Sequence, residues 1–563
     1  MTARRGIRRL LGAGLVASLT AALAACGPSG PQTINYLIDA RVNNYNVNTV
    51  DGFSSGAVMA LARVLPGFSY LGPDGELVAD RDVGTVSMEQ GSSLKVTYTF
   101  ADGAKYSDGQ PMACDDIMLA ATAMGGHVKG FNAATGAGYR DITNIECTPG
   151  GKTAVVTFAR GRDYADWRAL FGVGALLPAH VVARKAGVAN VVDPITKNDT
   201  AALAKIADAW NTGFEMHPGK VTAEDFPSAG PYRVAGYTTD KGLELIANQA
   251  WWGERPAAEH ITVWPRGTNY DTALKDGRID VVDTADLSAA DRMQGRTEST
   301  APQNRAGAKD ARPLSVTSLV LSGKGAFADP AMRKAFAACV PRDTLARKYG
   351  ANGLVWSLRT VAPADSLGSA LNQQFAKRYP RADAARARTL LGDRQGEAPG
   401  KPTVRIGYVA PDAVDKAIVE DIANSCTAAG IDVTDDSATE LTPASLGKDV
   451  DVLIANGPTG IAAAGTASGF PAAYQLFGGD GLDLPDFRDA QVSGAVNDLS
   501  LTVSDSARLP LLRSIETAAW DSVVSIPLFG TVRAREATDK VQRVVPGMAA
   551  TGTGWNMDRW TRK

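Results

Sequence analysis

The sequence from Phe100 to Asp116 reads FADGAKYSDGQPMACDD and contains two Asp-Gly pairs. Asp-Gly favours tight turns, because glycine accepts positive φ angles at no steric cost. The residues just before it, Ser93–Phe100, alternate between apolar and polar side chains, which predicts a strand with one buried face. Behind it, a helix is predicted to begin near Asp115, whose carboxylate can cap the helix. The stretch is therefore expected to lead from a strand through two turns into a helix.

Similar signals continue outward along the chain in both directions. Upstream, Thr33–Ile38 predicts an opening strand, and Ser54–Val64 predicts a helix because its apolar residues recur on one side. Downstream, Tyr232–Tyr237 and Leu243–Ala247 predict two strands of a hairpin, joined by the turn at 240–242. These elements mix strands and helices throughout the first half of the sequence.

The second half of the sequence predicts alternating strands and helices. Asp329 and Pro330 form a helix start, with aspartate as the N-cap and proline in the first position. Further on, 403–409 predicts a strand, 414–426 a helix with an apolar inner face, and 431–433 the start of another strand. This strand–helix–strand order predicts an α/β lobe.

Length and composition limit the class of protein. The 563 residues are 45% hydrophobic and 21% charged, which is ordinary for a globular protein. A chain far longer than about 250 residues needs more than one hydrophobic core, so we expect two lobes or more. The net charge of −2 and the absence of a basic stripe with interleaved aromatic residues argue against nucleic-acid binding.

The N-terminus has the pattern of a secretion signal. Four arginines within the first nine residues precede an almost uncharged run, Leu10–Ala25. Leu23-Ala24-Ala25-Cys26 resembles the bacterial lipobox, which implies a diacylglycerol on the Cys26 sulfur and cleavage before that residue. We therefore predict a signal peptide at 1–25, a lipidated tether at 26–32 and an extracytoplasmic body anchored to the cell membrane. The alternative is an ordinary cleaved signal with a chance cysteine.

Five segments, in the same order along the chain, resemble motifs of one protein family. That family is the extracytoplasmic solute-binding lipoproteins of peptide and nickel ABC importers, also called the oligopeptide/dipeptide-binding family or solute-binding family 5. The segments are FADGAKYSDGQPMACDD (100–116), SAGPYRVAGY with the later WWG (228–253), ALKDGRIDVVD (273–283), DPAMRKAFAACVPRDTL (329–345) and ETAAWDSVVSIPLFG (516–530).

The resemblance implies an α/β clamshell of two lobes with mixed sheets. Lobe I would take 33–312 plus 526–563, with a subdomain at about 61–221, and lobe II would take 313–525. Two crossing strands, near 314–321 and 523–529, would form the hinge. The resemblance also implies a monomer that captures short peptides, delivers them to an ABC permease with its ATPase, and uses no cofactor and no metal.

The four cysteines after Cys26 allow three disulfide pairings. In an oxidising compartment an even number of cysteines suggests disulfides. We favour Cys114–Cys147 and Cys339–Cys426, because each pair then stays within one proposed lobe. A zinc site is the alternative, but the sequence has no CxxC or HExxH spacing to support it.

The resemblance also implies residues that bind the ligand. FGGDGLDLPDF (477–487) resembles the acidic loop of the peptide binders, and their amine-pairing aspartate falls on Asp480. This loop departs from the family at Leu484-Pro485, so Asp483 and Asp486 are further candidates, and an ordinary acidic turn is the alternative. Arg359 could pair with a ligand carboxylate or lie on the surface. The expected pocket-lining residues are Asn44, Tyr45, Asn46 and Trp356, with a turn-rich loop and a packed core residue as their alternatives.

Other functions remain open from the sequence. Residues 52–56 match the G-x-S-x-G nucleophile elbow of serine hydrolases, but no buried strand is expected before them. Residues 445–448 match S-x-x-K, although the partner motifs of penicillin-binding proteins are missing. A third alternative is a lipoprotein of the same fold that regulates cell-envelope assembly instead of delivering a nutrient.

Overall fold

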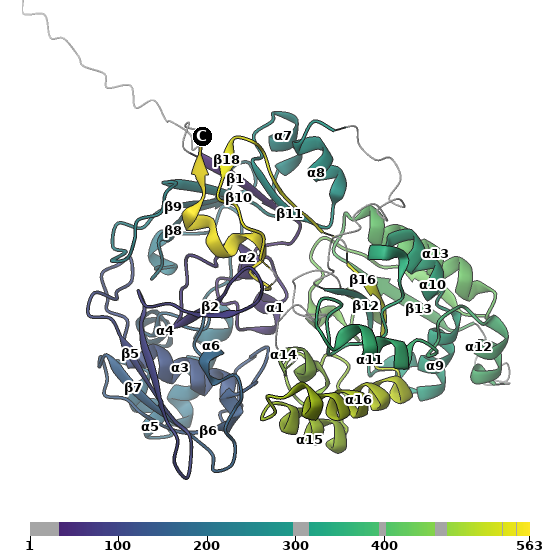
Figure 1. The fold of residues 1–563 in the computed structure, drawn as a ribbon, viewed down its shortest axis with the longest axis horizontal. Coiled ribbons are helices and arrows are strands. Elements are labelled where there is room, and N and C mark those ends of the chain that lie inside the picture. The colour runs from purple at the N-terminus through teal and green to yellow at the C-terminus, as the bar shows by residue number, and fades with distance from the viewer. Residues whose placement is uncertain (1–32, 297–314, 393–400, 456–469, 532, 548) are drawn as a thin grey trace, which may run out of the picture.

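The computed structural model describes residues 33–296, 315–392, 401–455, 470–531, 533–547 and 549–563. These residues form two lobes, each built around its own sheet (Figure 1). Lobe I contains both the start and the end of the described chain, and lobe II contains the green and yellow-green segments of Figure 1. Within the described part, none of the helices combines the length and the apolar character needed to cross a membrane. The predicted signal peptide, the tether and Cys26 lie outside the described residues.

Lobe I is organised by a six-stranded sheet in the order β17-β11-β1-β10-β9-β8. The opening strand β1 is fully buried and pairs in parallel with both β10 and β11, as expected for a strand in the middle of a sheet. The predicted hairpin is confirmed as the antiparallel pair β8 and β9. The strands are β1 (Thr33–Ile38), β8 (Tyr232–Thr238), β9 (Gly242–Ala247), β10 (His260–Trp264), β11 (Val281–Thr284) and β17 (Ala534–Ala537).

A second sheet of lobe I contains four antiparallel strands in the order β4-β5-β7-β6. The alternating strand predicted before Phe100 is confirmed as β5, and it leads into α3 as expected. The elements of this subdomain are β2 (Ser69–Leu71), β3 (Leu77–Ala79), β4 (Gly84–Glu89), β5 (Lys95–Phe100), α3 (Cys114–Gly125), β6 (Ile142–Glu146), β7 (Thr153–Phe158), α4 (Ala179–Ala186), α5 (Val192–Thr196) and α6 (Thr200–Thr212).

Two local predictions in lobe I were wrong. The helix expected over 54–64 is two short helices, α1 (Val50–Phe53) and α2 (Ala57–Ala60). Gly56 separates them and packs so closely that a Cβ there would lie 2.8 Å from the Ile38 side chain. Helix α3 begins after Ala113, and Asp116, not Asp115, accepts a hydrogen bond from the Ala113 N–H.

The chain returns to lobe I at its C-terminal end. Strand β17 closes the six-stranded sheet next to β11, and β18 then pairs with β19 as a short ribbon that contacts β1 through a hydrogen bond from Arg562 to the Thr33 carbonyl (Figure 1). The remaining elements of lobe I are α7 (Tyr270–Lys275), α8 (Leu287–Met293), β18 (Val541–Gln542), η10 (Gly552–Arg559) and β19 (Thr561–Arg562).

Lobe II has a five-stranded mixed sheet in the order β14-β13-β15-β12-β16. The predicted strand–helix–strand order is confirmed by β13, α13 and β14, and the capped helix start at Asp329 by α9. The elements are β12 (Val316–Leu321), α9 (Pro330–Cys339), α10 (Arg342–Tyr349), α11 (Gly368–Phe375), α12 (Ala384–Leu391), β13 (Thr403–Gly407), α13 (Ala413–Thr427), β14 (Asp432–Asp435), β15 (Val452–Ala455), α14 (Phe470–Ala473), α15 (Ala490–Leu499), α16 (Asp505–Ser522) and β16 (Ser525–Gly530).

Short 3-10 helices join these elements in both lobes. They are η1 (Tyr139–Asp141), η2 (Trp167–Ala169), η3 (Ala223–Asp225), η4 (Gly325–Ala328), η5 (Ala351–Gly353), η7 (Pro443–Ser445) and η9 (Tyr474–Leu476).

The predicted hinge strands are present, but one predicted boundary changes. β12 and β16 pair antiparallel inside the lobe II sheet, close to the positions expected for the two crossing strands. Because all of β16 belongs to that sheet, the chain leaves lobe II after Gly530, not after residue 525. The role of the two strands as a hinge stays a prediction, and we propose that the hinge lies at their paired ends, Val316 and Gly530.

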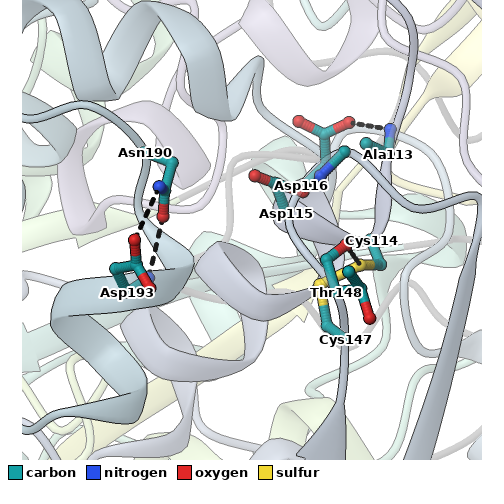
Figure 2. The surroundings of a disulfide bond; sticks show 9 residues. Ala113, Cys114, Asp115, Asp116, Cys147, Thr148, Asn190 and Asp193 are labelled. Carbon is teal, nitrogen blue, oxygen red and sulfur yellow. Dashed lines mark hydrogen bonds between the residues drawn. A yellow bond between two sulfur atoms is a disulfide. The ribbon is translucent and has the colours of Figure 1, made fainter.

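Both favoured disulfides are present, one in each lobe: Cys114–Cys147 and Cys339–Cys426. Figure 2 shows the first of them, which ties the start of α3 to the residue after β6, with Asp115 and Asp116 alongside. Cys114, Asp115 and Cys147 are close enough together to suggest a metal site. The two sulfurs are bonded to each other, however, so they cannot act as thiolate ligands.

Candidate functional site

Two adjacent cavities lie between the lobes. Their volumes are about 120 and 170 Å³, and both are lined by residues of lobe I and of lobe II. The cavities share Asp39, Ala285 and Arg266 from lobe I and Asp412 and Asp415 from lobe II. We call this shared space the cleft. Binding sites for small molecules are typically concave and occur preferentially at such domain interfaces.

The lobe I wall of the cleft is the loop that follows β1 and the short helix α1. Thr49 caps α1 by accepting a hydrogen bond from the Gly52 N–H, which fixes where α1 begins. Since Asp51 and Ser54 are three residues apart around α1, they lie on the same side of it. Both residues line the 120 Å³ cavity together with Asn43.

Asn44, Tyr45 and Asn46 do not line either cavity, which corrects the expectation for this loop. All three are buried, and Tyr45 and Asn46 are inaccessible. The Tyr45 hydroxyl donates to the Pro227 carbonyl, and Asn46 Nδ2 donates to the Trp210 carbonyl at 2.9 Å. These side chains hold the loop from inside lobe I, so their neighbours Asn43 and Asp51 form the cleft wall.

The arginines of the cleft are already paired. Arg533 contacts Asp39 and Asp283 at 2.9 and 3.0 Å, and Arg266 contacts Asp412 of lobe II at 3.1 Å. Burial by itself would raise the pKa of Asp39, but Arg533, the Ala285 N–H and Arg266 together outweigh burial and lower that pKa. Arg41 bonds to the Thr439 carbonyl and the Glu440 carboxylate of lobe II. Two of these pairs, Arg266–Asp412 and Arg41–Glu440, join the lobes across the cleft.

Three polar atoms on the lobe I wall have no hydrogen-bond partner within the described part of the chain. They are Asn43 Oδ1, Asp51 Oδ1 and Ser54 Oγ, and each is inaccessible to solvent in this conformation. Burial raises the pKa of Asp51, although the Thr442 side chain of lobe II lowers it. An unsatisfied buried polar group costs about 1–3 kcal/mol. A ligand that supplied hydrogen bonds to these atoms would remove that cost.

Asp480 forms a contact between the lobes. Its Oδ2 accepts hydrogen bonds from the Gly136 N–H at 2.9 Å and from Arg140 Nη2 at 3.1 Å, both in lobe I. Arg140 also lies over the Phe477 ring, with its guanidinium carbon 4.9 Å from the ring centre. Burial raises the pKa of Asp480 to about 6, while Gly136 and Arg140 lower it. In this conformation the carboxylate is occupied by lobe I, so a ligand amine would have to displace Arg140.

Asp483 and Asp486 shape the loop around Asp480. Asp483 accepts hydrogen bonds from the Gly479 and Phe487 N–H groups, and burial raises its pKa to about 7. Asp486 is exposed, has a left-handed φ of 56° and pairs with Arg488. Neither aspartate lines either cavity. Their expected ligand roles stay predictions. In this structure the contacts of both aspartates lie within the turn itself.

Arg359 and Trp356 are part of the lobe II core, which corrects their expected positions in the ligand pocket. Arg359 is 4% exposed and contacts Glu516 at 3.1 Å and Ser525 Oγ at 2.9 Å. The Trp356 ring is buried, and its Nε1 donates to the Val361 carbonyl. Neither residue lines either cavity. Arg359 therefore neutralises a buried glutamate instead of facing a ligand.

A second contact region joins the lobes where the subdomain of lobe I meets the C-terminal end of α15 in lobe II. The Ala165 N–H donates to the Ser500 carbonyl at 2.9 Å, and Arg162 Nη1 donates to the Asn497 carbonyl at 3.3 Å. Ala137 of lobe I belongs to the hydrophobic core of lobe II. The cleft is thus bounded by interlobe contacts on two sides, and the structure is a closed form.

The hydrolase motif does not form a nucleophile elbow. A nucleophile elbow places its serine between a buried strand and a helix. Here residues 52–56 begin inside α1, which follows a loop, and Ser54 follows the end of α1. Ser445 of the S-x-x-K match ends the 3-10 helix η7.

Two lobes with separate sheets and a cleft between them define a solute-binding protein. The chain belongs to the bacterial extracellular solute-binding proteins, family 5, because residues 89–480 match the description "Bacterial extracellular solute-binding proteins, family 5 Middle". The resemblance found in the sequence and the α/β clamshell are therefore confirmed. The family description is that of binding proteins, so the chain is classed with binding proteins and not with enzymes.

The chain is similar to lipoproteins and peptide-binding proteins of known sequence or structure. It is 38% identical to an uncharacterized lipoprotein of Mycobacterium tuberculosis, over 99% of this chain and 97% of the relative. It is 30% identical to the oligopeptide-binding protein OppA of the same species, over 54% of this chain and 47% of OppA. The fold is similar to the oligopeptide-binding protein AppA of Bacillus subtilis, solved with a nonapeptide, with a TM-score of 0.70, 12% identity and coverage of 94% and 99%.

The residues of the cleft were mostly missed by reasoning from the sequence. Asn43 and Asp51 flank the three residues that were chosen, and Ser54 was considered only as a nucleophile. The feature that could have identified these residues is the position of their loop, because it follows the central strand β1. Arg266 and Asp412 gave no signal, because they are 146 residues apart and meet only through the arrangement of the two lobes.

Proposed function

We propose that this protein is the substrate-binding lipoprotein of an ABC importer and captures short peptides between its lobes. The observation that carries the proposal is the cleft, a cavity shared by two lobes and bounded by interlobe contacts on two sides. Peptide as the ligand class is supported by the likeness to OppA in sequence and to AppA in fold.

The two walls of the cleft suit a ligand with a polar backbone and apolar side chains. Lobe I contributes the polar groups of Asn43, Asp51 and Ser54. Lobe II contributes a largely apolar wall to the 120 Å³ cavity, lined by Tyr408, Val409, Leu441, Pro443, Leu453 and Ile454. The backbone of a peptide needs hydrogen-bond partners when it is buried, whereas its side chains gain by leaving water.

The size of the cleft favours a short ligand. Typical small-molecule pockets measure roughly 300–1,000 Å³. Each cavity here is smaller than that range, and the two together approach its lower end. The closed form therefore suits a ligand of two or three residues better than a long peptide.

Capture proceeds by closure of the lobes. In an open form, ligand enters from the extracytoplasmic space and contacts the loop after β1. Rotation about the two hinge strands brings lobe II over the ligand and excludes water, which strengthens each polar contact inside the cleft. The closed form then docks on the permease, and the lipid on Cys26 keeps the protein near that membrane.

Thermal unfolding with ligand pools tests this function. We expect a pool of di- and tripeptides to raise the melting temperature, because a ligand at about 100 times its Kd adds about 2.7 kcal/mol of stability. Pools of sugars and nickel–histidine complexes serve as controls and should cause no shift. A shift with either control and none with peptides would replace the peptide by another solute. No shift with any pool would favour a regulator of envelope assembly.

A further inference from the structure

The lining of the cleft contains more acids than bases, and one of these acids, Asp51, is in lobe I and has no arginine beside it among the described residues. Four aspartates and three arginines line the 120 Å³ cavity. Arg533 pairs with Asp39, Arg266 with Asp412, and Arg41 with Glu440 outside the cavity. Asp51 makes no ion pair with any of the described residues, although its Oδ1 is inaccessible to solvent; the Thr442 side chain of lobe II is its only side-chain hydrogen-bond partner among them. A cationic group of the ligand would balance this charge.

The polar atoms around Asp51 all accept hydrogen bonds. Asn43 Oδ1 and Asp51 Oδ1 can only accept, and Ser54 Oγ can accept or donate. All three residues line the same cavity, and none of these three atoms has a hydrogen-bond partner among the residues that the structure describes. A primary ammonium group carries one positive charge and three N–H donors. An ammonium group that enters before the lobes close would therefore supply both the positive charge and the donors that this wall lacks.

The aspartate expected to hold a ligand amine is already in use. Arg140 of lobe I supplies the positive charge next to Asp480, and the Gly136 N–H donates to the same carboxylate oxygen. The Asp480 side chain is completely buried by these contacts. Asp480 therefore has a guanidinium in the place where a ligand ammonium would go, and it does not line either cavity.

We infer that Asp51, with Asn43 and Ser54, binds a primary ammonium group of the ligand, and that the Asp480–Arg140 pair is an internal contact that closes the lobes without ligand. This inference rests on the proposed function, because it assigns the amino end of a bound peptide. Lobe I would hold the amino group, and the apolar residues of lobe II would cover the remainder of the ligand. The reverse arrangement, with the ammonium on Asp480, requires Arg140 to move away.

Binding of free and N-acetylated peptide pools separates these assignments. The probe is an equimolar pool of dipeptides with free amino groups, compared with the same pool after N-acetylation. Each pool is titrated against the full-length protein while the melting temperature is recorded. For the wild type we expect the acetylated pool to need about tenfold more peptide, or more, for half-maximal stabilisation, since a charge-assisted contact is lost.

Two isosteric variants locate the ammonium group. Asp51→Asn should bind the free pool about tenfold more weakly than the wild type and should lose the preference for free over acetylated peptides. Asp480→Asn should keep that preference. The unfolding temperature of each variant without peptide shows that it is folded. Ser54→Ala, on the same wall, should weaken binding of the free pool less than Asp51→Asn does.

Each outcome decides the inference. If Asp480→Asn loses the preference and Asp51→Asn keeps it, the ammonium group lies on Asp480. Equal binding of both pools by the wild type overturns the inference but leaves peptide binding intact. If neither pool binds, the proposed function fails, and the diamine putrescine then tests Asp51 alone. Stabilisation by putrescine that is lost in Asp51→Asn supports the ammonium site, and no stabilisation overturns it.

Discussion

Replacing Glu516 by alanine is expected to destabilise lobe II by about 3–5 kcal/mol, because it leaves a buried arginine without its counter-charge. Glu516 is inaccessible and accepts hydrogen bonds from the N–H groups of Arg359 and Thr360 as well as from the Arg359 guanidinium. The Arg359 guanidinium also lies over the Trp520 ring, at 4.3 Å from its centre. The melting temperature should fall by roughly 6–20 °C in scanning calorimetry.

A surface ion pair of the same lobe provides the control. Asp343 and Arg347 lie on α10 four residues apart, with the Arg347 side chain 62% exposed. Asp343→Ala should cost no more than about 1 kcal/mol, because water screens such pairs. If Glu516→Ala unfolds at the temperature of the control, the buried pair does not contribute the stability assigned to it. Arg359 would then again be a candidate for binding a ligand carboxylate.

Replacing Gly481 by alanine is expected to weaken ligand binding by about tenfold or more, because the new methyl group separates the lobes. Gly481 follows Asp480 at the interlobe contact, and a Cβ there would lie 2.0 Å from the Ala133 carbonyl oxygen of lobe I. Both groups are close to the backbone, so neither can move aside without shifting a lobe. Calorimetric titration with the stabilising peptide pool measures the loss.

Gly494→Ala provides the matched control for Gly481→Ala, because it adds the same methyl group away from the contact between the lobes. Gly494 lies in α15 of the same lobe, and a Cβ there would meet no atom within 4 Å. Gly494→Ala should bind peptide like the wild type and should be slightly more stable, since alanine favours a helix over glycine by up to about 1 kcal/mol. Wild-type affinity in Gly481→Ala would mean that ligand binding does not require the closed contact.

The sequence predicted the fold well wherever a local signal was strong. Asp329 and Pro330 start α9, the turn at 240–242 joins β8 to β9, and the alternation before Phe100 marks β5. Each of these signals acts within a few residues, so the sequence carries it directly. The helix expected over 54–64 was wrong because a long-range contact of Gly56 with β1 interrupts it.

The site was harder to predict because its contacts join distant parts of the chain. Arg140 and Asp480 are 340 residues apart, and Arg359 and Glu516 are 157 apart. No local pattern tells which buried aspartate meets an arginine and which meets an empty cavity. Asp480 was identified as a key acidic residue from a motif, but its partner in lobe I could be found only in the folded structure.

Small-angle X-ray scattering of the wild-type protein, with and without the stabilising peptide pool, tests the central claim most directly. The claim is that the lobes open and then close around a ligand. The account predicts a larger radius of gyration without peptide and a compact form with peptide, and Gly481→Ala should stay extended in both samples. One unchanged compact scattering curve for the wild type under both conditions would contradict a clamshell that captures its ligand by closing.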